Sequence, residues 1–318
     1  MKELFEVTIE VTQRCPNKCI YCSSWSDLNK KDMLEFDAIC GIVDDATALG
    51  AKLINISGGE PLLRPDIVKI VEYIKAKELK IRLYTSGIIF NEGYHSVPVS
   101  LLESLRNKVD TLIVNYEAES PEKYAQVMGT FPDNLQLLDK TIEDALKLGF
   151  VVEAHLVPMK CNFRTIPQTL AKVYAMGISK VSFLRLVPQG RETEYVSDTL
   201  LSDEEELELK AMLKSLSELY GDKLRLGKPY RSQKFTSCNT GTIRLAVRYD
   251  GYVFPCGAFK DGVMEFSGES PDNIRNKRLI DIYNNSRYIE KVRQCLKGYY
   301  EGEVTEPCFG QYYRKLTQ

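Results

Sequence analysis

The chain has 318 residues, of which 44% are apolar and 27% charged, and its formal net charge is −2. This length is enough for one large domain, or one large and one small domain, without disulfides. The balanced charge gives no sign of a nucleic-acid partner, and no apolar run reaches the about 18 residues of a membrane span. The N-terminus does not read as a signal peptide, so we expect a cytoplasmic protein with neither nucleic-acid nor membrane partners.

The first 190 residues alternate β-branched segments with segments of helical periodicity. Strands are predicted at Glu6–Val11, Lys52–Ser57, Lys80–Thr85, Asp110–Asn115, Phe150–Val157 and Lys180–Val187. Helices are predicted at Leu34–Leu49, Asp66–Lys77, Val99–Arg106, Leu135–Leu148 and Ile166–Met176. Repeated βα units predict an α/β fold with a parallel sheet, here a partial (β/α)6 TIM-like barrel, and ligands bind at the carboxyl ends of such strands.

The remaining sequence changes in style. We expect a barrel over residues 1–190, a bridging helical segment over 191–237 and a small second domain over 238–318. In the bridge, Ser202 and Glu205 have the spacing of a helix capping box. The second domain is expected to contain a hairpin and a helix, at Thr242–Arg248, Tyr252–Phe254 and Arg278–Leu296.

Nine cysteines and two histidines are the unusual feature of the composition. In a cytoplasmic chain, thiols more often bind metals or carry redox chemistry than form structural disulfides. Because imidazole is scarce, any metal should be held mainly by sulfur, which favours zinc or iron–sulfur clusters.

Three of the cysteines, Cys15, Cys19 and Cys22, follow the first predicted strand within eight residues. A loop this short can wrap one small cluster, but three thiolates cannot complete the four-thiolate set of a cubane, so one iron stays open. Two other interpretations remain: buried apolar cysteines, or a zinc site with a distant fourth ligand.

The second predicted strand ends in a glycine-rich turn. Gly58 and Gly59 leave the backbone uncovered, so that a ligand can approach closely. Glu60 can accept hydrogen bonds from a cationic amine, and Pro61 follows it. A tight βα turn with a surface glutamate is the alternative interpretation.

Together, the three-cysteine motif and Gly58-Gly-Glu-Pro61 resemble the radical S-adenosylmethionine (SAM) superfamily. The resemblance implies a [4Fe–4S] cluster held by the three cysteines, whose open iron chelates the amino and carboxylate groups of SAM. It also implies that Gly58, Gly59 and Glu60 lie near the methionine amine. The remaining implied SAM contacts are Tyr21 near the adenine, Ser86 and Asn115.

One position departs from this pattern. Where many relatives have an Arg-Gly pair that helps to hold the SAM carboxylate, this chain has Met128-Gly129. Arg185 or Arg164 is the expected replacement cation. On the fifth predicted strand, Glu153 and His155 alternate and can both face the barrel interior, where a buried, hydrogen-bonded histidine is the simpler expectation.

A second group of cysteines, Cys238, Cys256, Cys295 and Cys308, lies in the C-terminal domain. The hairpin brings Cys238 and Cys256 together, and four thiolates would complete a fully ligated cluster, although a zinc-ribbon site has similar spacing. Asp250-Gly-Tyr-Val-Phe-Pro-Cys256 resembles the auxiliary-cluster extension called SPASM. Four cysteines fit its shorter form, "twitch", with one auxiliary [4Fe–4S] cluster.

Two cysteines are left over. Cys40 falls within an apolar helix, which indicates core packing. Cys161 follows the fifth predicted strand on the ligand-binding side of the barrel. There its thiol could return a hydrogen atom to a substrate radical, as in some radical SAM epimerases, or it could be an ordinary loop thiol.

The resemblance implies reductive cleavage of SAM to a 5′-deoxyadenosyl radical that abstracts a hydrogen atom from the substrate. We expect a peptide or protein substrate, net oxidation with the auxiliary cluster as electron acceptor, and a flavodoxin or ferredoxin as electron donor. The alternatives are a dehydrogenase or epimerase of a small molecule such as an aminoglycoside sugar, and a zinc-binding scaffold or regulatory protein. The C-terminal Lys-Leu-Thr-Gln counts against the enzyme that opens molybdenum-cofactor synthesis, which ends in Gly-Gly.

Overall fold

The computed structural model describes residues 3–227, 230, 238–260, 268–301, 308–310 and 312. Within these ranges, no helix has the length and apolar character needed to cross a membrane.

One curved sheet dominates the described structure, with strand order β11-β10-β1-β2-β3-β6-β7-β8-β9. All neighbours pair in parallel except β10 and β11. Its strands are β1 (Glu6–Thr12), β2 (Leu53–Gly58), β3 (Lys80–Thr85), β6 (Thr111–Asn115), β7 (Val152–Leu156), β8 (Lys180–Phe183), β9 (Leu224–Leu226), β10 (Arg244–Val247) and β11 (Val253–Phe254). The order ends at β11 and β9, so the sheet is an open barrel, as predicted.

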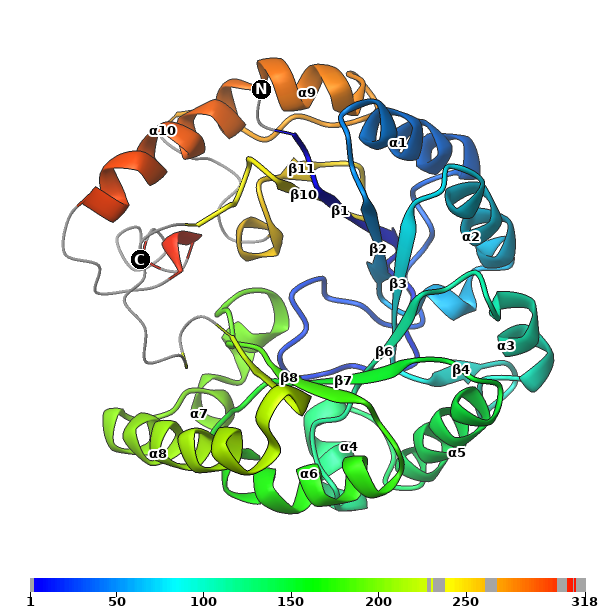
Figure 1. The fold of residues 1–318 in the computed structure, drawn as a ribbon, viewed down its shortest axis with the longest axis vertical. Helices are drawn as coiled ribbons and strands as arrows, with labels where there is room; N and C mark the ends of the chain where they lie inside the picture. The colour runs from blue at the N-terminus through cyan, green and yellow to red at the C-terminus, as the bar shows by residue number, and fades with distance from the viewer. Residues whose placement is uncertain are drawn as a thin grey trace.

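Helices surround the outer face of this sheet (Figure 1). They are α1 (Phe36–Ala48), α2 (Ile67–Ala76), α3 (Val99–Leu105), α4 (Pro121–Met128), α5 (Asn134–Lys147), α6 (Ile166–Ala175), α7 (Val196–Thr199), α8 (Asp203–Tyr220), α9 (Leu279–Asn285) and α10 (Arg287–Glu301). A separate two-stranded sheet joins β4 (Ile88–Phe90) and β5 (Tyr94–Ser96). Neither this sheet nor α4 was predicted from the sequence.

The strands divide their side chains between two environments. On β1, Val7, Ile9 and Val11 are buried in the main hydrophobic core, which also contains residues of the surrounding helices. Because strand side chains alternate, Thr8 and Glu10 face the interior of the barrel instead. The inner face is therefore polar, and it is the face available to a bound ligand.

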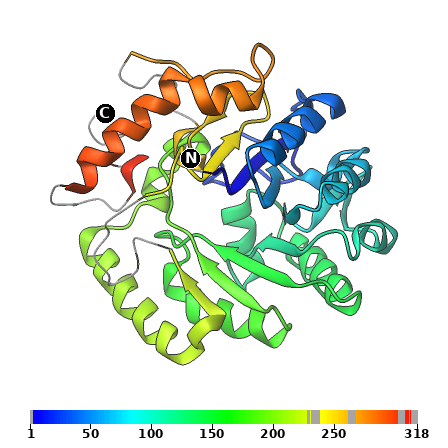
Figure 2. The same cartoon turned by 45° about the horizontal axis from the view of Figure 1, so that its top comes forward.

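The sheet is longer than the six predicted strands. The predicted hairpin is present as β10 and β11, but β10 also lies beside β1 (Figure 2) and pairs with it in parallel. In this register, Glu6 is opposite Arg244. The bridging segment contains the capping-box helix α8 and then β9, which pairs in parallel with β8. Both ends of the partial barrel are thus extended by elements from the second half of the chain.

The prediction of one continuous helix over Arg278–Leu296 is wrong. It is divided into α9 and α10 at Ser286, whose backbone is extended (φ −67°, ψ 120°). The Ser286 side chain accepts a hydrogen bond from Ile289 N (3.3 Å) and so satisfies an otherwise unpaired amide in the first turn of α10. The apolar periodicity continues across this break, which is why the pattern alone did not reveal it.

Candidate functional site

The three-cysteine loop leaves β1 at the carboxyl edge of the sheet and lies within the ring of strands (Figure 1). The end of α4 holds it: Lys18 N donates to Met128 O (3.1 Å), and Ile20 N donates to Val127 O (3.0 Å). Gly129 is needed here because a Cβ atom would lie 2.2 Å from the Lys18 carbonyl oxygen. Met128 and Gly129 therefore lie in direct contact with the cysteine loop.

The thiols of the loop lie in a buried environment. Cys15 is buried, and Cys19 and Cys22 are half-buried. Burial and the neighbouring thiols raise the pKa of Cys15 and of Cys19. A bound metal reverses this effect because it coordinates the thiolate.

The donor set fits an iron–sulfur cluster, since thiolates are the usual ligands of such clusters. Within the described residues, no group of three or more His, Cys, Asp or Glu side chains is arranged around a single metal ion. A cubane places each thiolate on a different iron, so it uses three thiols of one loop without bringing them to one point.

Arg191 also fixes the cysteine loop, a role that was not predicted from the sequence. It is buried, and its Nη1 and Nη2 donate to the carbonyl oxygens of Cys19 (2.9 Å) and Ser26 (2.7 Å). Its backbone N donates to Cys22 O (3.0 Å). Gly190 precedes it with φ +66°, where a Cβ atom would lie 2.4 Å from the Cys22 carbonyl oxygen.

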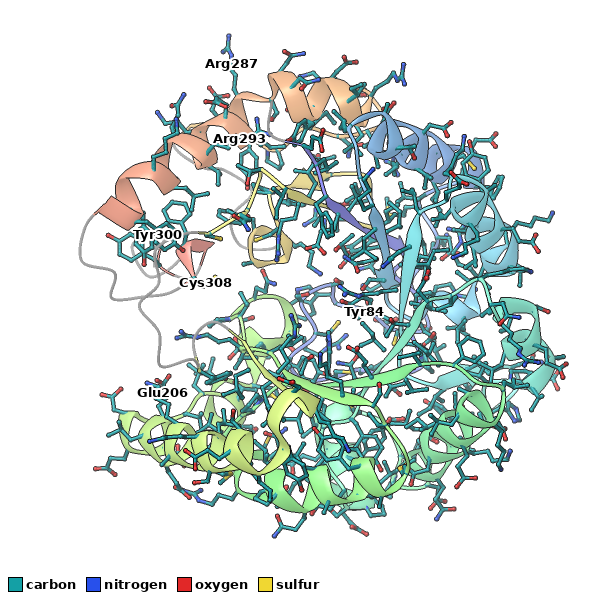
Figure 3. All side chains as sticks on the ribbon, in the orientation of Figure 1. Tyr84, Glu206, Arg287, Arg293, Tyr300 and Cys308 are labelled. Carbon is teal, nitrogen blue, oxygen red and sulfur yellow. The ribbon has the colours of Figure 1, made fainter. Side chains whose placement is uncertain are left out.

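We expect Arg191→Met to lower the free energy of unfolding by about 2–3 kcal/mol, because two buried carbonyls lose charged donors. The same change should lower the iron bound after reconstitution, since the loop loses its anchor. Urea denaturation and iron analysis measure both effects. Arg287→Met is the matched control, because Arg287 is exposed at the start of α10 (Figure 3). Equal stability of Arg191→Met and the control would contradict this role.

The glycine-rich turn packs directly against the start of the cysteine loop. A Cβ atom on Gly58 would lie 2.3 Å from Thr12 O, and one on Gly59 would lie 2.2 Å from Arg14 O. The amides of Gly59 and Glu60 donate to these same two oxygens, at 2.8 and 2.7 Å. The two glycines are thus required by backbone contact between two strand ends, and this contact places the turn next to Cys15.

Glu60 is fully buried, which contradicts the alternative of a surface glutamate. Its carboxylate accepts hydrogen bonds from Leu62 N (3.0 Å) and Thr85 Oγ1 (2.8 Å), and from the amide and hydroxyl of Ser86 (both 2.6 Å). Burial raises the pKa of Glu60, and these hydrogen bonds oppose that shift. Glu60 therefore ties the end of β2 to the end of β3 and fixes Ser86 at this edge.

Tyr21 is linked to β6 through a buried network. Asn115 Nδ2 donates to Tyr21 Oη (3.2 Å), and Tyr21 Oη donates to Glu117 Oε1 (2.8 Å). Glu117 was not predicted; burial raises its pKa to about 7, and its other oxygen accepts from Val157 N (2.8 Å). Met128 Sδ lies 3.8 Å from both Cys19 Sγ and Tyr21 Oη, so a thioether lies between the cysteine loop and this network.

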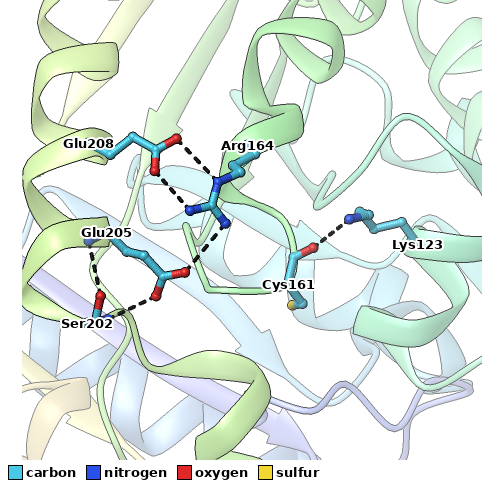
Figure 4. Close-up of polar contacts among 6 residues, drawn as sticks. All are labelled: Lys123, Cys161, Arg164, Ser202, Glu205 and Glu208. Carbon is cyan, nitrogen blue, oxygen red and sulfur yellow. Dashed lines mark hydrogen bonds and ion pairs between the residues drawn. The ribbon is translucent and has the colours of Figure 1, made fainter.

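Of the two proposed replacement cations, Arg164 makes its ion pairs elsewhere. Its guanidinium pairs with Glu208 (2.9 Å) and Glu205 (3.4 Å) on α8 (Figure 4), a helix on the outer side of the barrel (Figure 1). Arg185 lies two residues beyond β8, at the carboxyl edge, and stays a candidate.

Cys161 lies near the cysteine loop. It packs against the small apolar cluster formed by Ile20, Val127, Val157 and Met159, which Tyr21 also contacts. Burial raises the pKa of its thiol to about 11, so the thiol keeps its hydrogen at neutral pH. Its carbonyl accepts a hydrogen bond from Lys123 Nζ (2.7 Å) (Figure 4).

The four C-terminal cysteines are all half-buried. Burial raises the pKa of Cys256 to about 12, and the thiols of Cys308 and Cys238 add to this shift, so each of the two lies within electrostatic range of Cys256. Cys295 lies on α10 and packs against the main core.

His155 is buried on the inner face of β7, as expected, and stacks edge-to-face on Tyr84, with ring centroids 5.3 Å apart. No hydrogen bond joins its ring to another described residue, which differs from the expectation. Burial, with Arg225 and Arg82 nearby, lowers the pKa of His155 to about 3, so the ring is neutral at pH 7.

This lowered pKa gives a pH dependence of stability. The unfolded chain takes up a proton near the ordinary pKa of 6.5, whereas the folded chain does so only near about 3. The contribution is complete well above pH 6.5 and is lost as the pH falls, by about 1.4 kcal/mol between pH 7.5 and 5.5. We expect His155→Gln to remove this part of the loss, measured by urea denaturation at both pH values. His95→Gln is the control, since His95 is exposed on β5; identical pH dependence in both variants would contradict the assignment.

Two protein-family models match this chain. The model of the radical SAM superfamily matches residues 9–173, and that of the SPASM iron–sulfur cluster-binding domain matches residues 238–309. A probable GTP 3′,8-cyclase of Methanococcus maripaludis is 26% identical over 305 residues, covering 92% of this chain and 93% of that protein. The PqqA peptide cyclase of Granulibacter bethesdensis is 23% identical over 291 residues, covering 89% of this chain and 75% of that protein.

Solved structures share the fold. Streptococcus suis SuiB bound to S-adenosylmethionine superposes with a TM-score of 0.72 at 17% identity, covering 92% of this chain and 68% of SuiB. The enzyme anSMEcpe with bound AdoMet superposes with a TM-score of 0.65 at 13% identity, covering 93% of this chain and 83% of that chain. The chain therefore belongs to the radical SAM superfamily and carries a C-terminal SPASM domain.

Proposed function

We propose that the protein abstracts a hydrogen atom from a peptide or protein substrate and oxidises it. The observation that carries the proposal is the contact between the cysteine loop and the Gly58–Glu60 turn at the carboxyl edge of the sheet. SAM bound to a reduced [4Fe–4S] cluster supplies the 5′-deoxyadenosyl radical that performs this chemistry.

The chain's own residues would bind and orient these groups. Cys15, Cys19 and Cys22 would hold the cluster, and Arg191 would fix their loop. Carbonyl oxygens of the Gly58–Glu60 turn would accept hydrogen bonds from the methionine amine. The backbone amides of Gly59 and Glu60 already donate to Thr12 O and Arg14 O, so they are not available to SAM. Tyr21, Ser86 and Asn115 are the further candidate SAM contacts, and Arg185 is the candidate partner of its carboxylate.

A second [4Fe–4S] cluster is proposed at Cys238, Cys256, Cys295 and Cys308. With four thiolates it would lack an open iron, so it suits electron transfer rather than substrate activation. It would accept the electron left on the substrate after hydrogen abstraction, and a flavodoxin or ferredoxin would reduce the first cluster.

Two comparisons support a peptide substrate. A SuiB structure contains the precursor peptide SuiA, and an anSMEcpe structure contains the Cp18Cys peptide; both share the fold of this chain, with TM-scores of 0.72 and 0.65. The test is incubation of the reconstituted enzyme, SAM and dithionite with short peptides encoded beside its gene. We expect a peptide product lighter by two hydrogens, about 2 Da. Conversion of sugars or nucleotides, with no change in any peptide, would contradict the proposal and support the small-molecule alternative.

The Cys161→Ala variant distinguishes an oxidation from an epimerisation. If the enzyme oxidises its substrate, Cys161→Ala should keep product formation within about threefold of wild type, since no hydrogen atom is returned. If the enzyme is an epimerase, the variant should lose product formation and keep SAM cleavage. Product mass and deuterium uptake from solvent, read together, decide between these outcomes. Lys123→Met is the control, because Lys123 contacts only the Cys161 carbonyl in this loop.

A further inference from the structure

A row of polar side chains crosses the inner face of the sheet. Asn115, His155, Ser182 and Arg225 are register partners on the adjacent strands β6, β7, β8 and β9. Each alternates along its strand with residues of the main core, so all four point into the barrel. The row begins at Tyr21, to which Asn115 donates a hydrogen bond (3.2 Å).

Strand β3, the neighbour of β6, adds two side chains to the same inner face. Tyr84 stacks on His155 and points into the space enclosed by the strands (Figure 3). Arg82 lies two residues earlier on the same face of β3. Arg225 donates to Ser182, the register partner of His155, and Arg82 lies two residues from Tyr84, which stacks on His155, so both arginines approach this histidine.

The charges on this face are unevenly paired. Arg244, at the base of β10, pairs with Glu6 (3.3 Å). In the described part of the chain, Arg82 forms no ion pair, and Arg225 makes one hydrogen bond, from Nε to Ser182 Oγ (3.1 Å). Both are exposed to solvent. Glu153 also faces the interior from β7, but among the described residues it forms no ion pair with either arginine.

We propose that Arg82 and Arg225 bind an anionic group of the substrate, a carboxylate or a phosphate, beside the SAM site. This inference rests on the proposed function, because it places the substrate next to Tyr21 and Asn115. Guanidinium groups bind both kinds of anion through paired hydrogen bonds. Ser182 and neutral His155 offer further hydrogen bonds on the same face, and no described carboxylate forms an ion pair with either guanidinium group.

The test is anion binding by the reconstituted enzyme with SAM. Equilibrium dialysis with inorganic tripolyphosphate and, separately, with a pentaglutamate peptide distinguishes phosphate from carboxylate. We expect wild type to bind one of them, and Arg82→Gln and Arg225→Gln each to weaken that binding about tenfold. Arg244→Gln is the matched control on the same face; because Glu6 already pairs with Arg244, its binding should stay within about twofold of wild type.

Unchanged binding in both arginine variants, or an equal loss in Arg244→Gln, would overturn the inference, as would binding of neither probe to wild type. Formation of 5′-deoxyadenosine in the absence of substrate is measured on the same samples. If wild type fails to cleave SAM, the proposed function fails. If the variants cleave SAM but bind the probe as wild type does, only the anion site fails.

Discussion

Replacing Cys19 with alanine is expected to abolish the reductive cleavage of SAM. The change leaves two thiols on the loop that must hold the cluster, and the remaining ligands cannot retain it. Iron should fall from about eight to about four atoms per chain, and the rate of 5′-deoxyadenosine formation should fall at least about 10³-fold. Anaerobic reconstitution followed by iron analysis and chromatography measures both.

Cys40→Ala is the control for this experiment. Cys40 lies on α1, a helix that covers the outer face of the sheet, and it is half-buried and not among the residues of the main core, contrary to the expectation of core packing. The Cys40→Ala variant should keep the full iron content and the SAM cleavage activity of wild type. A Cys19→Ala variant that still binds about eight irons and cleaves SAM would show that this loop does not hold the cluster.

Replacing Cys256 with alanine should give the opposite division of effects. The proposed second cluster loses a ligand that lies within electrostatic range of Cys238 and Cys308, so iron should again fall to about four atoms per chain. SAM cleavage should persist, since the first cluster and its loop are untouched. Formation of the oxidised product should be lost, because the substrate's electron has no acceptor.

The SAM cleavage and iron content of Cys256→Ala are compared with those of Cys19→Ala. Loss of SAM cleavage in both variants, with equal iron content, would contradict two functionally separate clusters. Full iron content in Cys256→Ala would show instead that this thiol is not a cluster ligand.

Most of the barrel was predictable because its strands and helices have strong local periodicity. The segments Lys80–Thr85 and Asp110–Asn115 coincide with β3 and β6 to within one residue. The strand β9 has three residues, too few for a pattern, and its identity depends on pairing with β8. The parallel pairing of β10 with β1 joins residues more than 230 positions apart, which local sequence cannot reveal.

The same distinction between local motifs and long-range contacts applies to the candidate site. The cysteine spacing and the Gly58–Glu60 turn are contiguous motifs, so sequence alone identified them. Arg191 and Glu117 act through contacts that exist only in the folded chain, with Cys19 O and with Tyr21 Oη. A single arginine after a glycine, or a glutamate after a strand, is too common to indicate such a role.

The central claim is tested most directly by reconstituting the wild-type chain anaerobically and adding dithionite and SAM. The account predicts about eight irons per chain, an equal amount of sulfide, and formation of 5′-deoxyadenosine. A colourless protein that binds zinc without sulfide would support the zinc-scaffold alternative. Full loading with iron and sulfide but no 5′-deoxyadenosine would contradict the proposed enzyme function.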